Sequence, residues 1–204
     1  MSNLSKRILS SIVLGSVVLL LIYIGKIYFD ALLLICFLCG ILEIYKLKKI
    51  YVKLLIFLIL ILFIFSSHNL RNLENGLEFL YLVLTITWLS DIGGYIFGKY
   101  IGGKTINVIS PSKTYIGFVG SLIFSQFSFV VMILLNINIT NSIILTSFIF
   151  LISSLLVIIG DLTFSYLKRI EKIKDYSKLI PGHGGLFDRI DGLIFVIIFF
   201  NILL

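Results

Sequence analysis

Long apolar runs make up most of the chain, and they restrict its fold more than any other feature. A helix needs about 20 apolar residues to cross roughly 30 Å of hydrocarbon. Such segments must be helical, because lipid offers no partner for unpaired backbone N–H and C=O groups. The sequence therefore predicts an all-α fold, a polytopic membrane bundle of about seven transmembrane helices. The predicted spans are residues 8–24, 27–45, 52–65, 77–97, 114–135, 142–160 and 186–204.

The composition agrees with a membrane protein. Of the 204 residues 59% are apolar and only 13% are charged, and the mean hydropathy is +1.15, which is outside the range of domains with a water-exposed surface. We predict one membrane domain over residues 1–204. Residues 1–75 carry spans without motifs, and residues 76–204 carry the polar motifs described below.

The basic residues predict an orientation. If the N-terminus is cytoplasmic, 15 of the 17 lysines and arginines fall in cytoplasmic segments, and only Lys26 and Arg71 fall outside. This is the asymmetry that the positive-inside rule describes. It accounts for the net charge of +7 without a nucleic-acid partner. It predicts a multi-pass protein of the inner (cytoplasmic) cell membrane, with its polar segments, and therefore its active site, facing the cytoplasm.

Two segments, residues 89–118 and 160–192, are more polar than connections between spans need to be. They contain four carboxylates that lie within or beside apolar spans. These carboxylates are Asp91, Asp161, Asp188 and Asp191. An ionised carboxylate in a membrane helix costs about 2.5 to 3.5 kcal/mol, so each needs compensation. A salt bridge to a nearby lysine or arginine is the structural alternative, and a bound cation is the functional one.

The spacing of these residues favours a cation and phosphates. If a helix continues past residue 160, Asp161, Ser165 and Lys168 share one face, and Asp188 and Asp191 share a face of the last span. Mg²⁺ takes one or two carboxylates and completes its coordination with water and substrate phosphate. Lysine and arginine neutralise the remaining phosphate charge, and glycine lets the backbone approach a phosphate closely.

Three other patterns carry less weight. Residues 98–105 fit the G-x-x-x-x-G-K-[ST] P-loop pattern, but they follow a membrane helix instead of a buried strand. Cys36 and Cys39 form a C-x-x-C inside an apolar run without a second pair, which is typical of buried apolar side chains and not of a redox or zinc site. His183 lies between glycines and is a candidate acid, base or phosphate donor, or else a loop residue that holds a turn.

The motifs resemble a known family. The segment from Ser165 to Asp191, with Lys-Arg at 168–169 and Pro-Gly-His-Gly-Gly-Leu-Phe-Asp-Arg-Ile-Asp at 181–191, is similar to the signature of the phosphatidate cytidylyltransferases, also called CDP-diacylglycerol synthases. Asp91-x-Gly-Gly-Tyr-x-Phe-Gly-Lys99 and Ile109-Ser-Pro-Ser-Lys-Thr-x-x-Gly-Phe118 resemble the same family.

This resemblance implies an Mg²⁺-dependent nucleotidyltransferase that converts CTP and phosphatidate into CDP-diacylglycerol and pyrophosphate during phospholipid biosynthesis. Asp161 and Asp188 are then expected to bind metal and to be catalytic, with Asp191 as a further metal candidate. Lys168 and His183 are the other catalytic candidates. The residues expected to bind substrate are Asp91, Lys113, Ser165, Lys168, Arg169, Gly184, Gly185 and Arg189.

The chain also departs from the family pattern. Ile116 and Phe164 stand where relatives commonly have glutamate, which puts the number of bound cations in question. A CTP-dependent enzyme acting on another lipid and an ion-coupled transporter are the alternative functions, although no repeat symmetry supports a transporter. A homodimer is retained as an assembly to test.

Overall fold

The computed structural model describes residues 3–107, 110–177, 179 and 184–204. Helices dominate this part of the chain, and two short antiparallel strands pair Thr105 with Thr114 and Asn107 with Ser110. The elements are α1 (Asn3–Ile24), α2 (Lys26–Lys46), α3 (Ile50–Asn72), α4 (Gly76–Tyr100), β1 (Thr105–Asn107), β2 (Ser110–Thr114), α5 (Tyr115–Ser125), α6 (Ser128–Leu134), α7 (Ile143–Glu171) and α8 (Phe187–Leu203).

The polytopic helical bundle predicted from the sequence is confirmed, but the count of seven spans is not. Among the described residues, five stretches are long and apolar enough to cross a membrane. They are α2, α3, α4, residues 115–134 and α7. Helix α8 has 17 residues. In α1 the described apolar stretch, Gly15–Ile24, is shorter than these five candidate spans.

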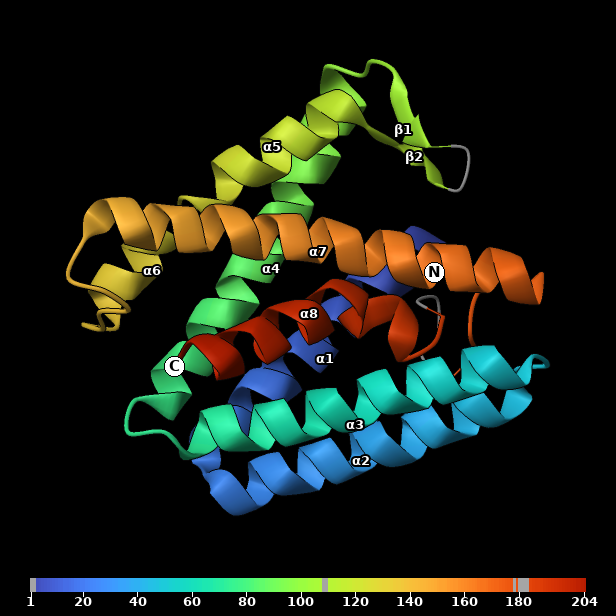
Figure 1. The fold of residues 1–204 in the computed structure, drawn as a ribbon, viewed down its shortest axis with the longest axis horizontal. Helices are drawn as coiled ribbons and strands as arrows, with labels where there is room; N and C mark the ends of the chain where they lie inside the picture. The colour runs from blue at the N-terminus through green and yellow to red at the C-terminus, as the bar shows by residue number, and fades with distance from the viewer. Residues whose placement is uncertain (1–2, 108–109, 178, 180–183) are drawn as a thin grey trace.

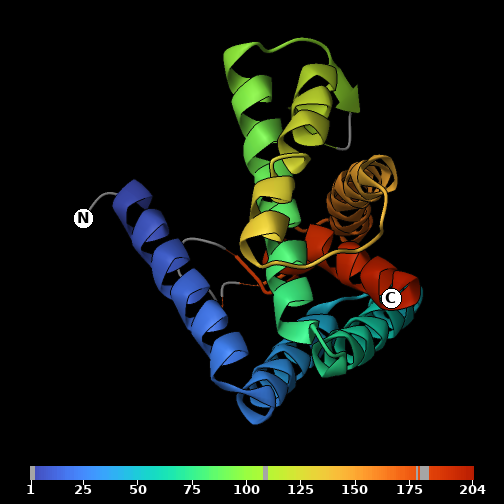
Figure 2. The same cartoon turned by 90° about the vertical axis from the view of Figure 1, so that its left-hand side faces the viewer.

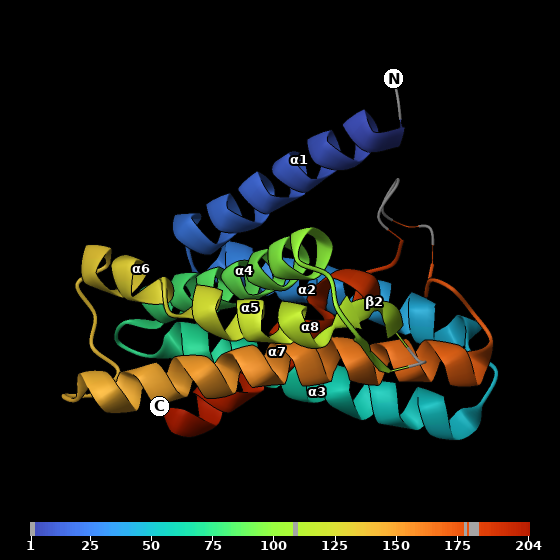
Figure 3. The same ribbon diagram turned by 90° about the horizontal axis from the view of Figure 1, so that it is seen from above.

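Four helices run alongside one another and a fifth crosses them. In Figure 1, α2, α3, α8 and α7 lie roughly parallel in space, and α4 passes steeply across them. Helix α5 and the β1–β2 hairpin lie at the upper end of α4. Helix α1 ends beside the beginning of α2, and its N-terminal end lies away from the rest of the bundle, as Figures 2 and 3 show.

Glycines set the contact between α4 and α5. A Cβ atom on Gly120 would lie 2.6 Å from the Gly93 carbonyl oxygen, and one on Gly117 would lie 2.8 Å from the Gly94 carbonyl oxygen. Small residues of this kind let membrane helices approach closely. Gly93, Gly94 and Gly117 of the upstream motifs, with Gly120, therefore bring one helix backbone against another.

Two predicted spans differ from the observed helices. Helix α3 continues to Asn72, beyond the predicted end at residue 65, because Ser67 donates to the Phe63 carbonyl (2.7 Å) and His68 pairs with Asp30 (2.8 Å). The predicted span 114–135 is divided into α5 and α6. At the break, Gln126 accepts a hydrogen bond from Ser147 of α7 (2.7 Å).

The core and the outer surface are both apolar. Val52, Ile56 and Leu60 recur every four residues along α3 and are fully buried, as expected for one helix face. Many large apolar side chains point outward, and Ile27 is 82% exposed. An apolar exterior of this extent fits a lipid environment.

Candidate active site

The site is built where the C-terminal half of α7 meets the start of α8. Helix α7 continues to Glu171, beyond the predicted end at residue 160, so the condition for a common face of Asp161, Ser165 and Lys168 is met. A Cβ atom on Gly160 would lie 3.0 Å from the Gly192 Cα atom, so the two helices touch through their backbones. This contact places Asp161 beside the first turns of α8.

Asp188 is held from both sides. Its Oδ1 atom accepts a hydrogen bond from Lys168 Nζ (2.7 Å), and its Oδ2 atom accepts from the backbone N–H groups of Tyr176 (3.0 Å) and Gly185 (2.9 Å). The Asp188 side chain is only 6% exposed. Its place in the first turn of α8 adds the favourable field of the helix N-terminus. Asp188 is therefore a nearly buried carboxylate in a fixed orientation.

Asp161 is the second paired carboxylate. It forms an ion pair with Lys113, the penultimate residue of β2, and accepts a hydrogen bond from Ser165 one turn further along α7 (3.4 Å). The next residue, Thr114, caps α5 by accepting a hydrogen bond from the Gly117 N–H group (3.0 Å). The hairpin and the cap together position the Lys113 side chain next to Asp161 on α7.

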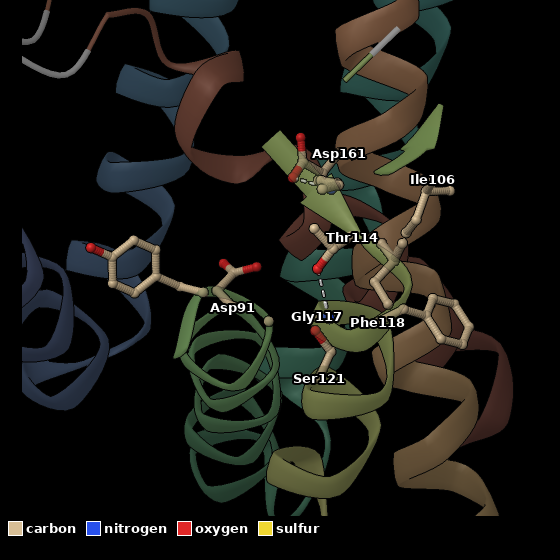
Figure 4. Close-up of a pocket in the computed structure, with 11 residues that line it drawn as sticks. Asp91, Ile106, Thr114, Gly117, Phe118, Ser121 and Asp161 are labelled. Carbon is tan, nitrogen blue, oxygen red and sulfur yellow. Dashed lines mark hydrogen bonds and ion pairs between the residues drawn. The ribbon is translucent and has the colours of Figure 1, made fainter. Parts of the chain in front are cut away.

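A cavity of about 220 Å³ lies beside this pair. Figure 4 shows Asp91 and Asp161 on different elements along this cavity, with the Thr114 and Ser121 hydroxyl groups nearby. Its floor is partly backbone, because Gly94 and Gly117 also line it. The cavity combines carboxylates, one lysine and hydroxyl groups, so it can accept a polar group.

The other predicted residues lie around the same helix ends. Arg169 and Arg189 are exposed. Asp191 accepts a hydrogen bond from the N–H group of its neighbour Gly192 (2.9 Å). Gly184 has a φ of 87°, and a Cβ atom there would lie 2.9 Å from Asp188 Oδ2, so glycine is required both by conformation and by space. His183 lies outside the described residues.

The carboxylates are suitable for a hard cation, but the metal assignment stays a prediction. Within the described part of the chain, no group of three or more His, Cys, Asp or Glu side chains is arranged to hold a metal ion. Mg²⁺ needs only one or two carboxylates when phosphate oxygens complete its coordination. Asp161 and Asp188 provide such oxygens, and each is balanced here by a lysine.

An aromatic cluster replaces one of the glutamates that the resemblance leads us to expect. Phe164 is fully buried and stacks on Phe187, with 5.5 Å between the ring centroids. Tyr176 packs edge-on against both rings and donates a hydrogen bond to the Phe164 carbonyl (3.2 Å). Burial, and then the charge of Asp188, raise the pKa of Tyr176 well above its ordinary value. Tyr176 is therefore a permanent donor that anchors the loop.

Two glutamates of the site were missed by the sequence analysis. Glu43 on α2 is 0% exposed and contacts the loop before α8, and Glu171 at the end of α7 is 4% exposed and contacts the turn between α2 and α3. Glu43 is the only acidic residue between Asp30 and Glu74. The cost of a carboxylate in an apolar span, which singled out the aspartates, was the signal that could have found it.

The fold and the site together define a polytopic membrane protein with a cluster of carboxylates and lysines at one end of its helices. Comparison with known sequences gives the family. The model of the cytidylyltransferase family matches residues 45–204, and the chain belongs to this family.

Similar curated proteins are named phosphatidate cytidylyltransferase. The protein of Staphylococcus saprophyticus is 43% identical over 133 residues, that of Staphylococcus haemolyticus 40% over 135, and that of Staphylococcus aureus strain COL 41% over 143. Each match covers 64% of this chain and 50% of the relative. The chain thus spans about half the length of the curated relatives it matches.

Proposed function

We propose that this protein transfers the cytidylyl group of CTP to phosphatidate, forming CDP-diacylglycerol and releasing pyrophosphate. The observation that carries the proposal is the presence of two carboxylate–lysine pairs, Asp161 with Lys113 and Asp188 with Lys168, on neighbouring elements. Carboxylates for a cation and lysines for phosphates are what a reaction between two phosphate compounds requires. Membership of the cytidylyltransferase family and the names of the relatives support the same reaction.

The chemistry needs little help from a base. A phosphate monoester has its second pKa near about 6 and is largely dianionic at neutral pH, so the phosphatidate oxygen is already a nucleophile. It attacks the α-phosphorus of CTP, and the bond between that phosphorus and the pyrophosphate oxygen breaks. Catalysis then consists mainly of alignment and of neutralising the leaving group.

The described residues divide this work between them. Asp161 and Asp188 would hold Mg²⁺, which when bound neutralises phosphate charge. Lys113 and Lys168 each lie within ion-pairing distance of one of these carboxylates, so each lysine can neutralise a phosphate bound beside its partner. The cavity of about 220 Å³ is smaller than the roughly 300 to 1,000 Å³ of complete ligand sites. We assign to it a phosphate-bearing part of a substrate.

The proposed location is the inner membrane, with the site facing the cytoplasm. The turn between α2 and α3, the end of α7 and the β1–β2 hairpin each carry or adjoin basic residues, and all three lie toward the same side in Figure 1. By the positive-inside rule this side is cytoplasmic, where CTP is available. The homodimer stays a prediction.

The first experiment measures incorporation of labelled CTP into lipid by the purified protein in detergent. We expect activity that requires both phosphatidate and Mg²⁺, and a loss of at least about 100-fold in Asp188→Asn, because the amide removes the charge at the metal site. Asp30→Asn is the matched control, since Asp30 pairs with His68 at the far end of α3. Labelled product formed only with a different lipid acceptor would refute phosphatidate as the substrate.

A further inference from the structure

We infer that Glu43, in the part of the chain without motifs, is a positioning residue that fixes the orientation of Asp188. The inference rests on the proposed function, because it takes Asp188 as the metal-binding carboxylate. It extends the active site to α2 and α3, whose contribution no motif indicates.

The Glu43 carboxylate takes the place of a helix cap. Its Oε1 atom accepts hydrogen bonds from the Leu186 N–H group and the Ser177 hydroxyl (both 2.7 Å), and its Oε2 atom accepts from the Phe187 N–H group (3.2 Å). The first N–H groups of a helix have no partner inside the helix, and the N-cap position of α8, Leu186, offers no side-chain cap. A carboxylate from another helix therefore supplies the cap and interacts favourably with the helix dipole.

These contacts lie next to both backbone groups that orient Asp188. Its Oδ2 atom accepts from the N–H groups of Gly185 and Tyr176. Glu43 holds the residue after each of them, Leu186 and Ser177. When Glu43 fixes these neighbours, it fixes the two donors as well. The Oδ1 atom of Asp188 then faces Lys168 in a constant direction.

Two glycines allow α2 to come this close. A Cβ atom on Gly185 would lie 2.6 Å from Glu43 Oε1, and a Cβ atom on Gly40 would lie 3.3 Å from the Phe187 ring. Gly185 thus lies between the two carboxylates: it contacts Glu43 and donates its N–H group to Asp188. A side chain at Gly185 would displace the Glu43 carboxylate, and one at Gly40 would meet Leu60 of α3 at 2.7 Å as well as Phe187.

Glu171 makes the reciprocal connection. From the end of α7 it accepts hydrogen bonds from the N–H groups of Lys48 (2.7 Å) and Lys49 (2.9 Å) at the start of α3, and Lys49, the N-cap of α3, has no side-chain cap of its own. We call Glu43 and Glu171 together the carboxylate clasp. Glu43 reaches from the last turn of α2 to the start of α8, and Glu171 reaches from the end of α7 to the α2–α3 turn. The clasp therefore ties α2 and the α2–α3 turn to both helices that flank the loop before Asp188.

The test is the affinity for metal measured on folded protein, because a partial loss of folded protein lowers the number of sites and not their dissociation constant. Purified Glu43→Gln would be titrated with Mn²⁺, a paramagnetic substitute for Mg²⁺, with and without CTP, and followed by electron paramagnetic resonance. Glutamine keeps the size but has one acceptor oxygen, and its NH₂ group faces backbone donors. We expect an apparent dissociation constant for Mn²⁺ raised about 10-fold or more. Glu74→Gln, an exposed glutamate in the turn before α4, should match the wild type.

A second variant decides the question if Glu43→Gln does not fold. Ser177→Ala removes one donor to Glu43 and leaves the carboxylate in place, so we expect a smaller rise of the same dissociation constant, about two- to fivefold. If folded Glu43→Gln binds Mn²⁺ with wild-type affinity, the inference is overturned. If Glu43→Gln does not fold, wild-type affinity in Ser177→Ala overturns it. The inference would also be overturned if the wild type, with or without CTP, showed no Mn²⁺ binding that Asp188→Asn removes.

The two proposals fail in different ways. A wild type that binds Mn²⁺ through Asp188, with an affinity that Glu43→Gln lowers, but transfers no cytidylyl group to phosphatidate would refute the proposed function and leave the positioning role of Glu43 intact. A wild type that makes CDP-diacylglycerol while Glu43→Gln keeps its metal affinity would support the proposed function and refute the positioning role of Glu43.

Discussion

At the scale of single residues, the pair of Lys168 and Asp188 determines how the site behaves without ligand. Both side chains are largely buried, and Lys168 also lies 5.8 Å from the centroid of the Tyr176 ring. Removing one partner of a buried pair leaves the other charge unpaired and costs about 3 to 5 kcal/mol. Here two backbone N–H groups still hold Asp188, so we expect a smaller loss.

Lys168→Gln should therefore unfold at a lower temperature than the wild type, and Mg²⁺ should raise its unfolding temperature more than that of the wild type. The divalent cation would replace the missing positive charge at Asp188. Thermal unfolding in detergent with and without Mg²⁺ measures both effects. Lys174→Gln, at an exposed position, is the control, and equal responses of the two variants would contradict the role of Lys168.

At the scale of the elements, the backbone contact between α7 and α8 sets the site. Gly160→Ala should destabilise the protein by about 1 to 3 kcal/mol and reduce activity, because the new methyl group would meet Phe195 at 2.9 Å and Gly192 at 3.0 Å. Gly15→Ala in α1 is the matched control. Among the described residues, no atom outside the adjoining helix backbone lies within 4 Å of a Cβ there, so its effect should be neutral or slightly stabilising, as for alanine in an open helix position. The same effect from both changes would show that the contact is not tight.

At the scale of the whole molecule, the charge distribution predicts the orientation in the membrane. After replacement of Cys36 and Cys39 by serine, single cysteines at Lys104→Cys and Glu74→Cys can be labelled with an impermeant maleimide. Both positions are exposed and lie at opposite ends of α4, just beyond its last and first residues. We expect Glu74→Cys to react on intact cells and Lys104→Cys only after permeabilisation. The opposite result would place the site outside.

The sequence alone determined the features that depend on local periodicity and hydropathy. The spans follow from the length of apolar runs, because lipid forces each run to satisfy its own backbone. The common face of Asp161, Ser165 and Lys168 on a helix that continues past residue 160 follows from a repeat of 3.6 residues per turn. Local rules missed the effect of polar contacts, as in the extension of α3 to Asn72 and the break after Ser125.

Only the tertiary structure decided which distant residues meet. Lys113 and Asp161, and Glu43 and Leu186, are far apart in the chain, and no spacing rule connects them. Helices in lipid associate through close packing and individual hydrogen bonds, because their apolar faces gain little from contact with one another. Such contacts depend on the shape of both surfaces at once. The sequence could therefore identify Asp188 as a site residue, but only the packing of α2 against α8 identified Glu43 as the residue that holds its turn.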